Sequence, residues 1–70
     1  MKIKVKLTGI LASSAGFRER EIEMLEGTTI INLPVSGQWT KSSVNGSLRS
    51  KNYALNDGDE LLFFPVGGGG

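Results

Sequence analysis

Residues 60–66 restrict the fold more than any other part of this chain, because they are apolar on both faces that a strand presents. Successive side chains of a strand point to opposite faces. Leu61 and Phe63 therefore share one face, and Leu62 and Phe64 share the other. A strand of this kind usually lies in the middle of a sheet, covered on both sides. We expect residues 60–66 to be a central strand.

A chain of 70 residues forms one small domain that buries only about 60% of its unfolded surface. One short helix covers one face of such a sheet. The second apolar face then stays exposed until a partner covers it, or a loop such as residues 9–16 folds over it. The first alternative makes the exposed pair an interaction site, since apolar patches on small proteins commonly mark one.

Composition excludes several classes of function. The chain has no cysteine and no histidine, which removes disulfides, thiolate nucleophiles, zinc–thiolate sites and the commonest metal ligand and general base. We expect no metal site and no self-contained enzyme. A net charge of +1 gives no electrostatic case for nucleic acid. No apolar run is long enough to span a membrane, and the start lacks a signal-peptide pattern, so the expected location is the cytoplasm.

Residues 2–7 alternate strictly between lysine and an aliphatic residue, which predicts a half-buried strand. Residues 9–16 are expected to be a loop, and residues 17–25 a second strand. If the two strands form a hairpin, three glutamates face three lysines. We favour a solvated ladder of opposite charges over an anion-binding face, because the lysines then have partners. The residues concerned are Lys2, Lys4, Lys6, Glu19, Glu21 and Glu23.

The middle of the chain predicts a short helix. Thr28 or Thr29 offers an N-cap oxygen just before an aliphatic group, but Pro34 and Gly37 limit the helix to one or two turns. Trp39 is expected to pack at the edge of the core; an exposed contact residue is the alternative.

Asn45-Gly46 is the strongest turn signal, because both residues accept the positive φ of a type I′ hairpin turn. We expect short strands at about 41–44 and 47–50. Residues 56–59 are expected to form another turn before the last strand.

Taken together, these segments resemble a known family. Val44-Asn45-Gly46, then Leu55-Asn56-Asp57-Gly58-Asp59-Glu60-Leu61, then Phe63-Phe64-Pro65-Val66 and a closing Gly69-Gly70 are similar to the ubiquitin-like sulfur carriers. These are the small subunit of molybdopterin synthase and the thiamin-pathway sulfur carrier (the MoaD/ThiS group). The resemblance covers most of the chain and weakens between residues 31 and 43.

The resemblance implies an α+β fold of the β-grasp (ubiquitin-like) class, a mixed sheet of about four to five strands with one short helix. The first and last strands would lie side by side and parallel in the middle. The expected division is a β-grasp domain over residues 1–66 and a flexible glycine tail over 67–70. Two departures stand out: the helix segment is short, and the tail has four glycines where the family typically has two.

The resemblance also implies a mechanism. An activating enzyme adenylates the C-terminal carboxylate, here that of Gly70, with ATP, and sulfur from a persulfide donor replaces AMP to give a thiocarboxylate. A second enzyme, a synthase, then accepts the sulfur. The chain itself would bind no cofactor and would be a cosubstrate rather than an enzyme. Gly69 and Gly70 are the expected reactive end; the expected partner-binding residues are Leu62, Phe64, Pro65, Val66, Gly67 and Gly68.

Two other functions stay open at this stage. The same adenylate of Gly70, attacked by a lysine amine, would make the chain a protein modifier. A β-grasp binding module with an inert tail is the third possibility. The receiving pathway is also open: molybdenum or tungsten cofactor, thiamin and thiolated tRNA are all compatible with the sequence.

Overall fold

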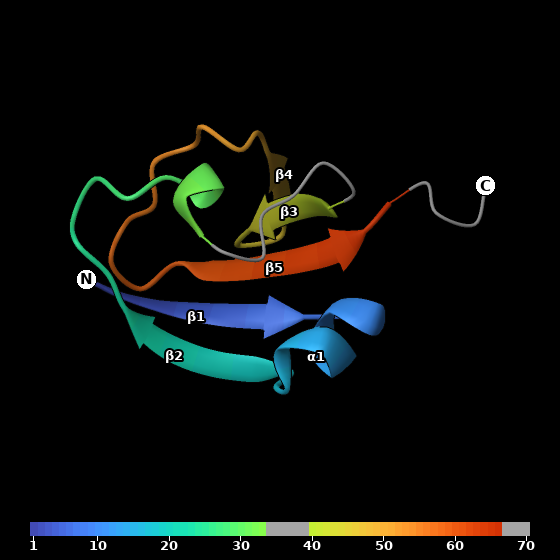
Figure 1. The fold of residues 1–70 in the computed structure, drawn as a ribbon. Coiled ribbons are helices and arrows are strands. Elements are labelled where there is room, and N and C mark those ends of the chain that lie inside the picture. Colours follow the sequence, from blue (N-terminus) through green and yellow to red (C-terminus); the bar gives the residue numbers. More distant parts are fainter. Residues whose placement is uncertain (34–39, 67–70) are drawn as a thin grey trace.

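The chain folds into one five-stranded mixed sheet with two short helical segments (Figure 1). The computed structural model describes residues 1–33 and 40–66. The strand order is β2-β1-β5-β3-β4. The elements are β1 Lys2–Leu7, α1 Ile10–Ala15, β2 Glu19–Glu23, the 3-10 helix η1 Ile30–Asn32, β3 Thr40–Val44, β4 Ser47–Arg49 and β5 Glu60–Pro65.

The last strand is central, as predicted. β5 pairs in parallel with β1 on one side and antiparallel with β3 on the other. This arrangement of first and last strands is the one that the β-grasp class requires, and the expected fold class is confirmed. The buried apolar core draws on all three of these strands and on the segments that cover them: Ile3, Val5, Leu7, Met24, Ile30, Val44, Leu55, Leu61 and Phe63.

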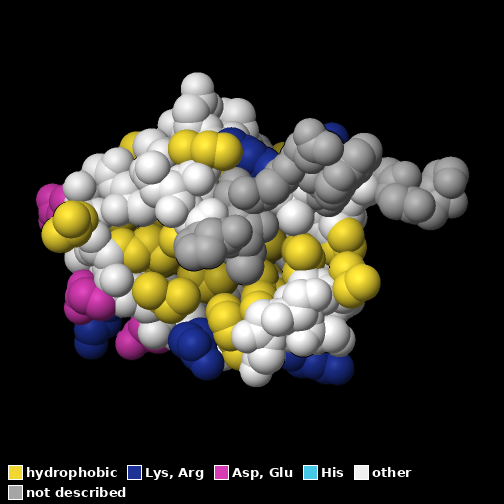
Figure 2. Space-filling model, in the orientation of Figure 1, with side chains coloured by type: hydrophobic (Ala, Val, Ile, Leu, Met, Phe, Trp, Pro, Cys, Tyr) yellow, Lys and Arg dark blue, Asp and Glu magenta, His cyan; other side chains and the backbone are white. Residues whose placement is uncertain are grey.

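The two faces of β5 differ in burial. Leu61 and Phe63 are fully buried on the face that η1 and α1 cover, whereas Leu62 and Phe64 are only half-buried and lie outside the core cluster. Hydrophobic side chains form a band across the face on which the helical segments lie, with Lys and Arg at the rim of that view (Figure 2). The face with Leu62 and Phe64 is therefore the less covered face of β5.

The expected loop at residues 9–16 is wrong, because residues 10–15 form α1. Leu11 and Ala12 pack against the core, which supplies the stabilisation that the serine-rich sequence lacks. Gly16 then ends the helix in the left-handed region at φ 84°. This helix lies where β1 ends and β2 begins (Figure 1). It packs on the core side of the sheet, and so it does not cover Leu62 and Phe64 on the other face.

The helix expected after Thr28 or Thr29 is reduced to the single 3-10 turn η1 within the described residues. Thr29 is its N-cap, and its backbone N–H and hydroxyl both donate to Asn32 Oδ1, at 3.1 and 2.9 Å. Ile30 is the one residue of η1 that enters the core. Pro34, Gly37 and Trp39 lie outside the described residues.

The two hairpins agree with their predictions. Asn45 and Gly46 join β3 to β4 with φ of 51° and 88°, the positive values that a type I′ turn needs. β2 lies antiparallel to β1 with the three glutamates opposite the three lysines. Contacts in the ladder are partly diagonal, with Lys2–Glu21 at 4.0 Å and Lys4–Glu19 at 3.8 Å. In the part of the chain that the structure describes, no helix is long and apolar enough to cross a membrane.

The burial difference along β5 predicts unequal effects of truncation. Phe63→Ala should lower the free energy of unfolding by about 3–5 kcal/mol, because it leaves a cavity in the core. Phe64→Ala, next to it on the half-buried face, should cost much less. Urea unfolding followed by circular dichroism measures both. Equal losses would show that Phe64 belongs to the core and that β5 is covered on both faces.

Candidate docking face and tail exit

β5 ends at a defined position, beside the start of β3. Its last residue, Pro65, is paired with Thr40 at the start of β3. A Cβ built on Gly9, just before α1, would lie 3.8 Å from the Pro65 ring. The chain thus leaves the sheet between the end of β1 and the start of β3. The expected reactive end, Gly69 and Gly70, and the expected partner-binding residues Gly67 and Gly68 lie outside the described residues.

The predicted docking residues fall into two groups. Leu62 and Phe64 lie on the same outer face of the sheet, away from the core. Pro65 is exposed and, by strand alternation, belongs to the opposite face beside Gly9. Val66 is half-buried at the exit. The structure therefore brings together the first pair only.

The structure adds a residue that sequence reasoning missed. Cross-strand register places Ser43 beside Leu62, and Leu48 beside Ser43. Leu48 is 65% exposed on this outer face. We call Leu62, Phe64 and Leu48 the outer apolar patch. The small side chain of Ser43 lies between its two halves, so that the patch extends across three strands. The sequence signal for Leu48 is its place after Asn45-Gly46, but its neighbours are set by pairing between distant segments.

One ion pair lies beside the outer apolar patch. Lys6 Nζ is 3.0 Å from Glu60 Oε1, and Lys6 also approaches Glu19 at 3.9 Å. The hydrogen bond to Lys6, followed by its positive charge, lowers the pKa of the Glu60 carboxyl. The same hydrogen bond raises the pKa of Lys6. Both groups are exposed to solvent, so salt screens the pair and its contribution to stability is small.

The family-like motif residues hold the start of β5 in place. Asn45 and Asp59 link the β3–β4 turn to the turn that precedes β5. Asn45 Nδ2 donates to Asp59 Oδ1 at 3.0 Å, and the Glu60 N–H donates to Asn45 Oδ1 at 3.0 Å. Asp59 is 93% buried, and its Oδ2 accepts the Asn56 N–H at 2.8 Å. Buried polar groups satisfied in this way fix geometry. These residues are structural, and the chemistry must lie elsewhere.

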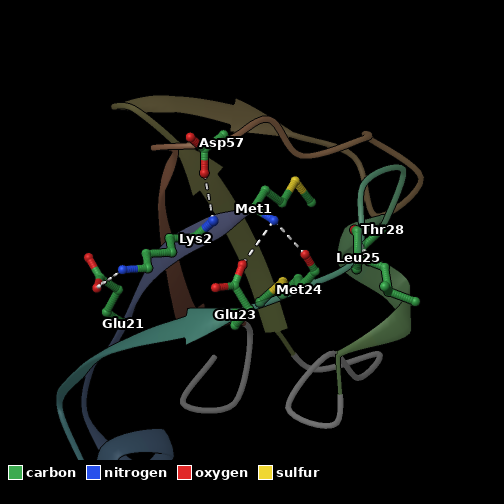
Figure 3. Close-up of polar contacts among 8 residues, drawn as sticks. All are labelled: Met1, Lys2, Glu21, Glu23, Met24, Leu25, Thr28 and Asp57. Carbon is green, nitrogen blue, oxygen red and sulfur yellow. Dashed lines mark hydrogen bonds and ion pairs between the residues drawn. The ribbon is translucent and has the colours of Figure 1, made fainter.

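Asp57 performs the corresponding role for β1. Its Oδ1 accepts the Lys2 N–H at 2.6 Å (Figure 3). The Gly58 N–H donates to the Lys2 carbonyl at 2.8 Å. The Met1 ammonium donates to the Met24 carbonyl at 2.8 Å and pairs with Glu23 at 3.0 Å. Residues 1–33 and 40–66 contain no group of three acidic, histidine or cysteine side chains that could hold a metal ion.

Comparisons with known proteins find solved structures that share this fold. No protein-family model matches the sequence, and a search of curated proteins finds no significant match. Solved structures do match. One, from Pyrococcus furiosus and assigned as molybdopterin converting factor subunit 1, is 28% identical, covers 93% of this chain and 97% of its own, and superimposes with a TM-score of 0.80.

The chain has the ubiquitin-like β-grasp fold and is similar to a MoaD-type protein. Two structures of SAMP1, small archaeal modifier protein 1 from Haloferax volcanii, share the fold at 22% identity. One covers 100% of both chains with a TM-score of 0.79; the other covers 91% of this chain and 95% of its own with a TM-score of 0.75. The MoaD/ThiS resemblance seen in the sequence is thereby confirmed.

The Lys6–Glu60 pair predicts a measurable titration. Because the folded-state pKa of Glu60 lies below its unfolded value, the pair adds stability above the ordinary carboxyl pKa and loses it as pH falls through the lowered value. Lys6→Met should move the Glu60 pKa back toward the ordinary range, as followed by the pH dependence of its carboxyl ¹³C shift. Lys2→Met, which removes the same charge at the far end of β1, should leave it in place. An unchanged pKa in Lys6→Met would contradict the assigned cause.

Proposed function

We propose that this chain is a sulfur carrier whose Gly70 carboxylate is adenylated and then converted to a thiocarboxylate. The observation that carries the proposal is the match to molybdopterin converting factor subunit 1 over nearly the whole of both chains. The position of the glycines adds support. They follow directly on β5, the central strand of a rigid sheet, and glycine has no Cβ to obstruct a narrow active site.

The proposed chemistry begins with a poor electrophile. A Gly70 carboxylate oxygen attacks the α-phosphorus of ATP, forming a mixed anhydride and releasing pyrophosphate. The terminal sulfur of a protein persulfide then attacks the carbonyl carbon, and AMP leaves. A thiol of the enzyme system cleaves the resulting acyl disulfide, which leaves the thiocarboxylate on Gly70 and a disulfide on the donor. ATP, persulfide and thiol all belong to the partners, so the chain acts as a cosubstrate and needs no bound cofactor.

The tail length sets the geometry of delivery. Four extended residues reach at most about 14 Å, at ~3.3–3.6 Å per residue. A partner that accepts Gly70 must therefore hold the sheet close to the entrance of its active site. Ordering the tail costs roughly 1–2 kcal/mol per residue, so docking has to offset this loss. Leu62 and Phe64 on the outer apolar patch are the proposed anchors, with Pro65 and Val66 at the entrance.

Two partners follow from this scheme: an ATP-dependent activating enzyme and a synthase that accepts the sulfur. Both would bind the same outer face, one after the other, because each must hold the sheet close enough for the short tail to reach its active site. The pathway that receives the sulfur is set by the synthase and is not specified by the residues of this chain.

Protein modification is the second candidate function. The fold match to one SAMP1 structure extends over the whole of both chains, and the name of that protein describes a modifier. Modification would share the adenylation of Gly70 and differ in the nucleophile, a lysine amine in place of sulfur. The product would then be an isopeptide bond to a target protein.

Intact-mass spectrometry distinguishes the two outcomes. After incubation with the activating enzyme from the source cells, ATP and a sulfur donor, we expect one oxygen to be exchanged for sulfur, confined to the C-terminal peptide. Isopeptide-linked conjugates without this exchange would favour the modifier. The mass of the protein isolated from its source also checks that Gly70 is its natural end.

Paired glycine substitutions provide the matched control. The double variant of Gly69→Ala and Gly70→Ala should lose most of the sulfur exchange, because side chains then enter the narrowest part of the partner's site. Gly67→Ala with Gly68→Ala should retain it, since these residues add reach. Normal exchange in the first variant would refute activation at this end of the chain.

If docking uses the outer apolar patch, a substitution there should weaken binding to the activating enzyme without unfolding the protein. Phe64→Glu should weaken binding to the activating enzyme by at least about tenfold, because it places a charge where apolar area is buried. Its fold should persist, as circular dichroism and thermal unfolding would show. Ser14→Glu on exposed α1 adds the same charge away from the patch and should bind normally. A folded Phe64→Glu protein with unchanged affinity would place docking elsewhere.

A further inference from the structure

Charge is unevenly distributed along this chain. All seven carboxylates fall within residues 19–26 and 57–60, and residues 27–56 contain three cations and no acidic side chain. The cations are Lys41, Arg49 and Lys51. They gather where β4 ends against β3, around an open hollow of about 420 Å³ that Ser42, Leu48 and Ser50 help to line. We call this region the β4 edge.

Two of the three cations of the β4 edge, Arg49 and Lys51, contact neutral groups. Arg49 lies over the Tyr53 ring, with its guanidinium carbon 5.0 Å from the ring centre. Lys51 Nζ donates to Thr40 Oγ1 at 3.2 Å. Every side-chain ion pair that the structure shows among the described residues involves a lysine of β1 instead. The positive charge of the β4 edge is therefore oriented without being neutralised.

The backbone at this edge is also open. β4 is a terminal strand of the sheet. None of the described residues pairs with the backbone edge of β4 that points away from β3. All three of its residues are exposed. A terminal strand presents N–H and C=O groups that pair readily with an added strand. Its central residue, Leu48, belongs to the outer apolar patch, so that the edge and the patch are continuous.

The charges lie on both sides of the sheet. Lys41 follows Thr40 and precedes Ser42, so alternation directs it to the outer face, where it is paired with Phe64. Arg49 is paired with Ser42 and shares the opposite, core-side face. An extended peptide suits this arrangement, because its own side chains point in turn to the two faces of the sheet.

We propose that the β4 edge is a docking site for an extended acidic segment of a partner protein, which adds to the sheet as a sixth strand beside β4. Its carboxylates would meet Arg49 and Lys51 on one face and Lys41 on the other, and an aliphatic residue would contact Leu48. The inference is independent of the chemistry proposed for Gly70, because it depends only on the edge and its charges.

Nuclear magnetic resonance titration of the full chain tests the proposal. The probe is a blocked hexapeptide, Glu-Val-Glu-Glu-Val-Glu, and its control has lysine in place of every glutamate. We expect the acidic probe to shift amide signals of residues 41–43 and 47–51 and to slow hydrogen exchange of the β4 amides. The basic peptide should do neither. No shifts with the acidic peptide, or shifts without slower exchange, would overturn the added strand.

Two double variants that each remove two positive charges distinguish binding at the β4 edge from an effect of net charge. Arg49→Gln with Lys51→Gln should weaken binding of the acidic probe by at least about threefold, since exposed ion pairs each contribute a fraction of a kcal/mol to about one. Lys2→Gln with Lys4→Gln removes the same charge from the other half of the sheet and should bind nearly as the unaltered protein does. Equal weakening in both, or the same signal pattern produced by inorganic phosphate alone, would refute a peptide site at the β4 edge. Sulfur exchange at Gly70 is measured separately, so failure of either proposal leaves the other standing.

Discussion

The parallel pairing of β1 with β5 is the constraint on which this small structure depends. Parallel neighbours cannot be joined by a tight turn, so everything from Thr8 to Asp59 serves as the connection between them. The pairing is fixed at its start, where Lys2 bonds to Asp57 and Gly58 and the Lys4 N–H donates to the Asp59 carbonyl at 3.0 Å. From this point Leu61 and Phe63 enter the core, and β5 ends beside the start of β3.

Signals confined to neighbouring residues predicted much of this fold. The alternation over residues 2–7 identified β1, and Asn45-Gly46 identified the hairpin of β3 and β4. The helix α1 escaped prediction because its sequence is rich in serine and bounded by glycines, features typical of loops. Its stability comes from Leu11 and Ala12 against a core assembled by other segments. Propensity within six residues contains no information about that packing.

The candidate docking face shows the same limit. Leu62 and Phe64 were identifiable from the sequence, because β5 is apolar on both faces and one helix in so small a domain covers only one of them. Leu48 and Lys41 were not, since each joins that face through register between segments far apart in sequence. The motif that indicates the family proved to be structural: Asn45 and Asp59 bond to each other and position β5. The motif residues thus position the start of β5, whereas Leu48 and Lys41 join the outer face only through strand pairing.

In the proposed complexes, the outer apolar patch and the β4 edge would contribute differently to binding. Ordering four glycines costs about 4–8 kcal/mol, from roughly 1–2 kcal/mol for each residue. Burial of apolar surface on Leu62, Phe64 and Leu48 is the term large enough to offset much of this, at about 25 cal/mol per Å². Exposed charges add less affinity, but they speed association and fix orientation. In the proposed complexes, the cations of the β4 edge would therefore favour the approach in which the exit of β5, the second strand from β4, faces the partner's active site.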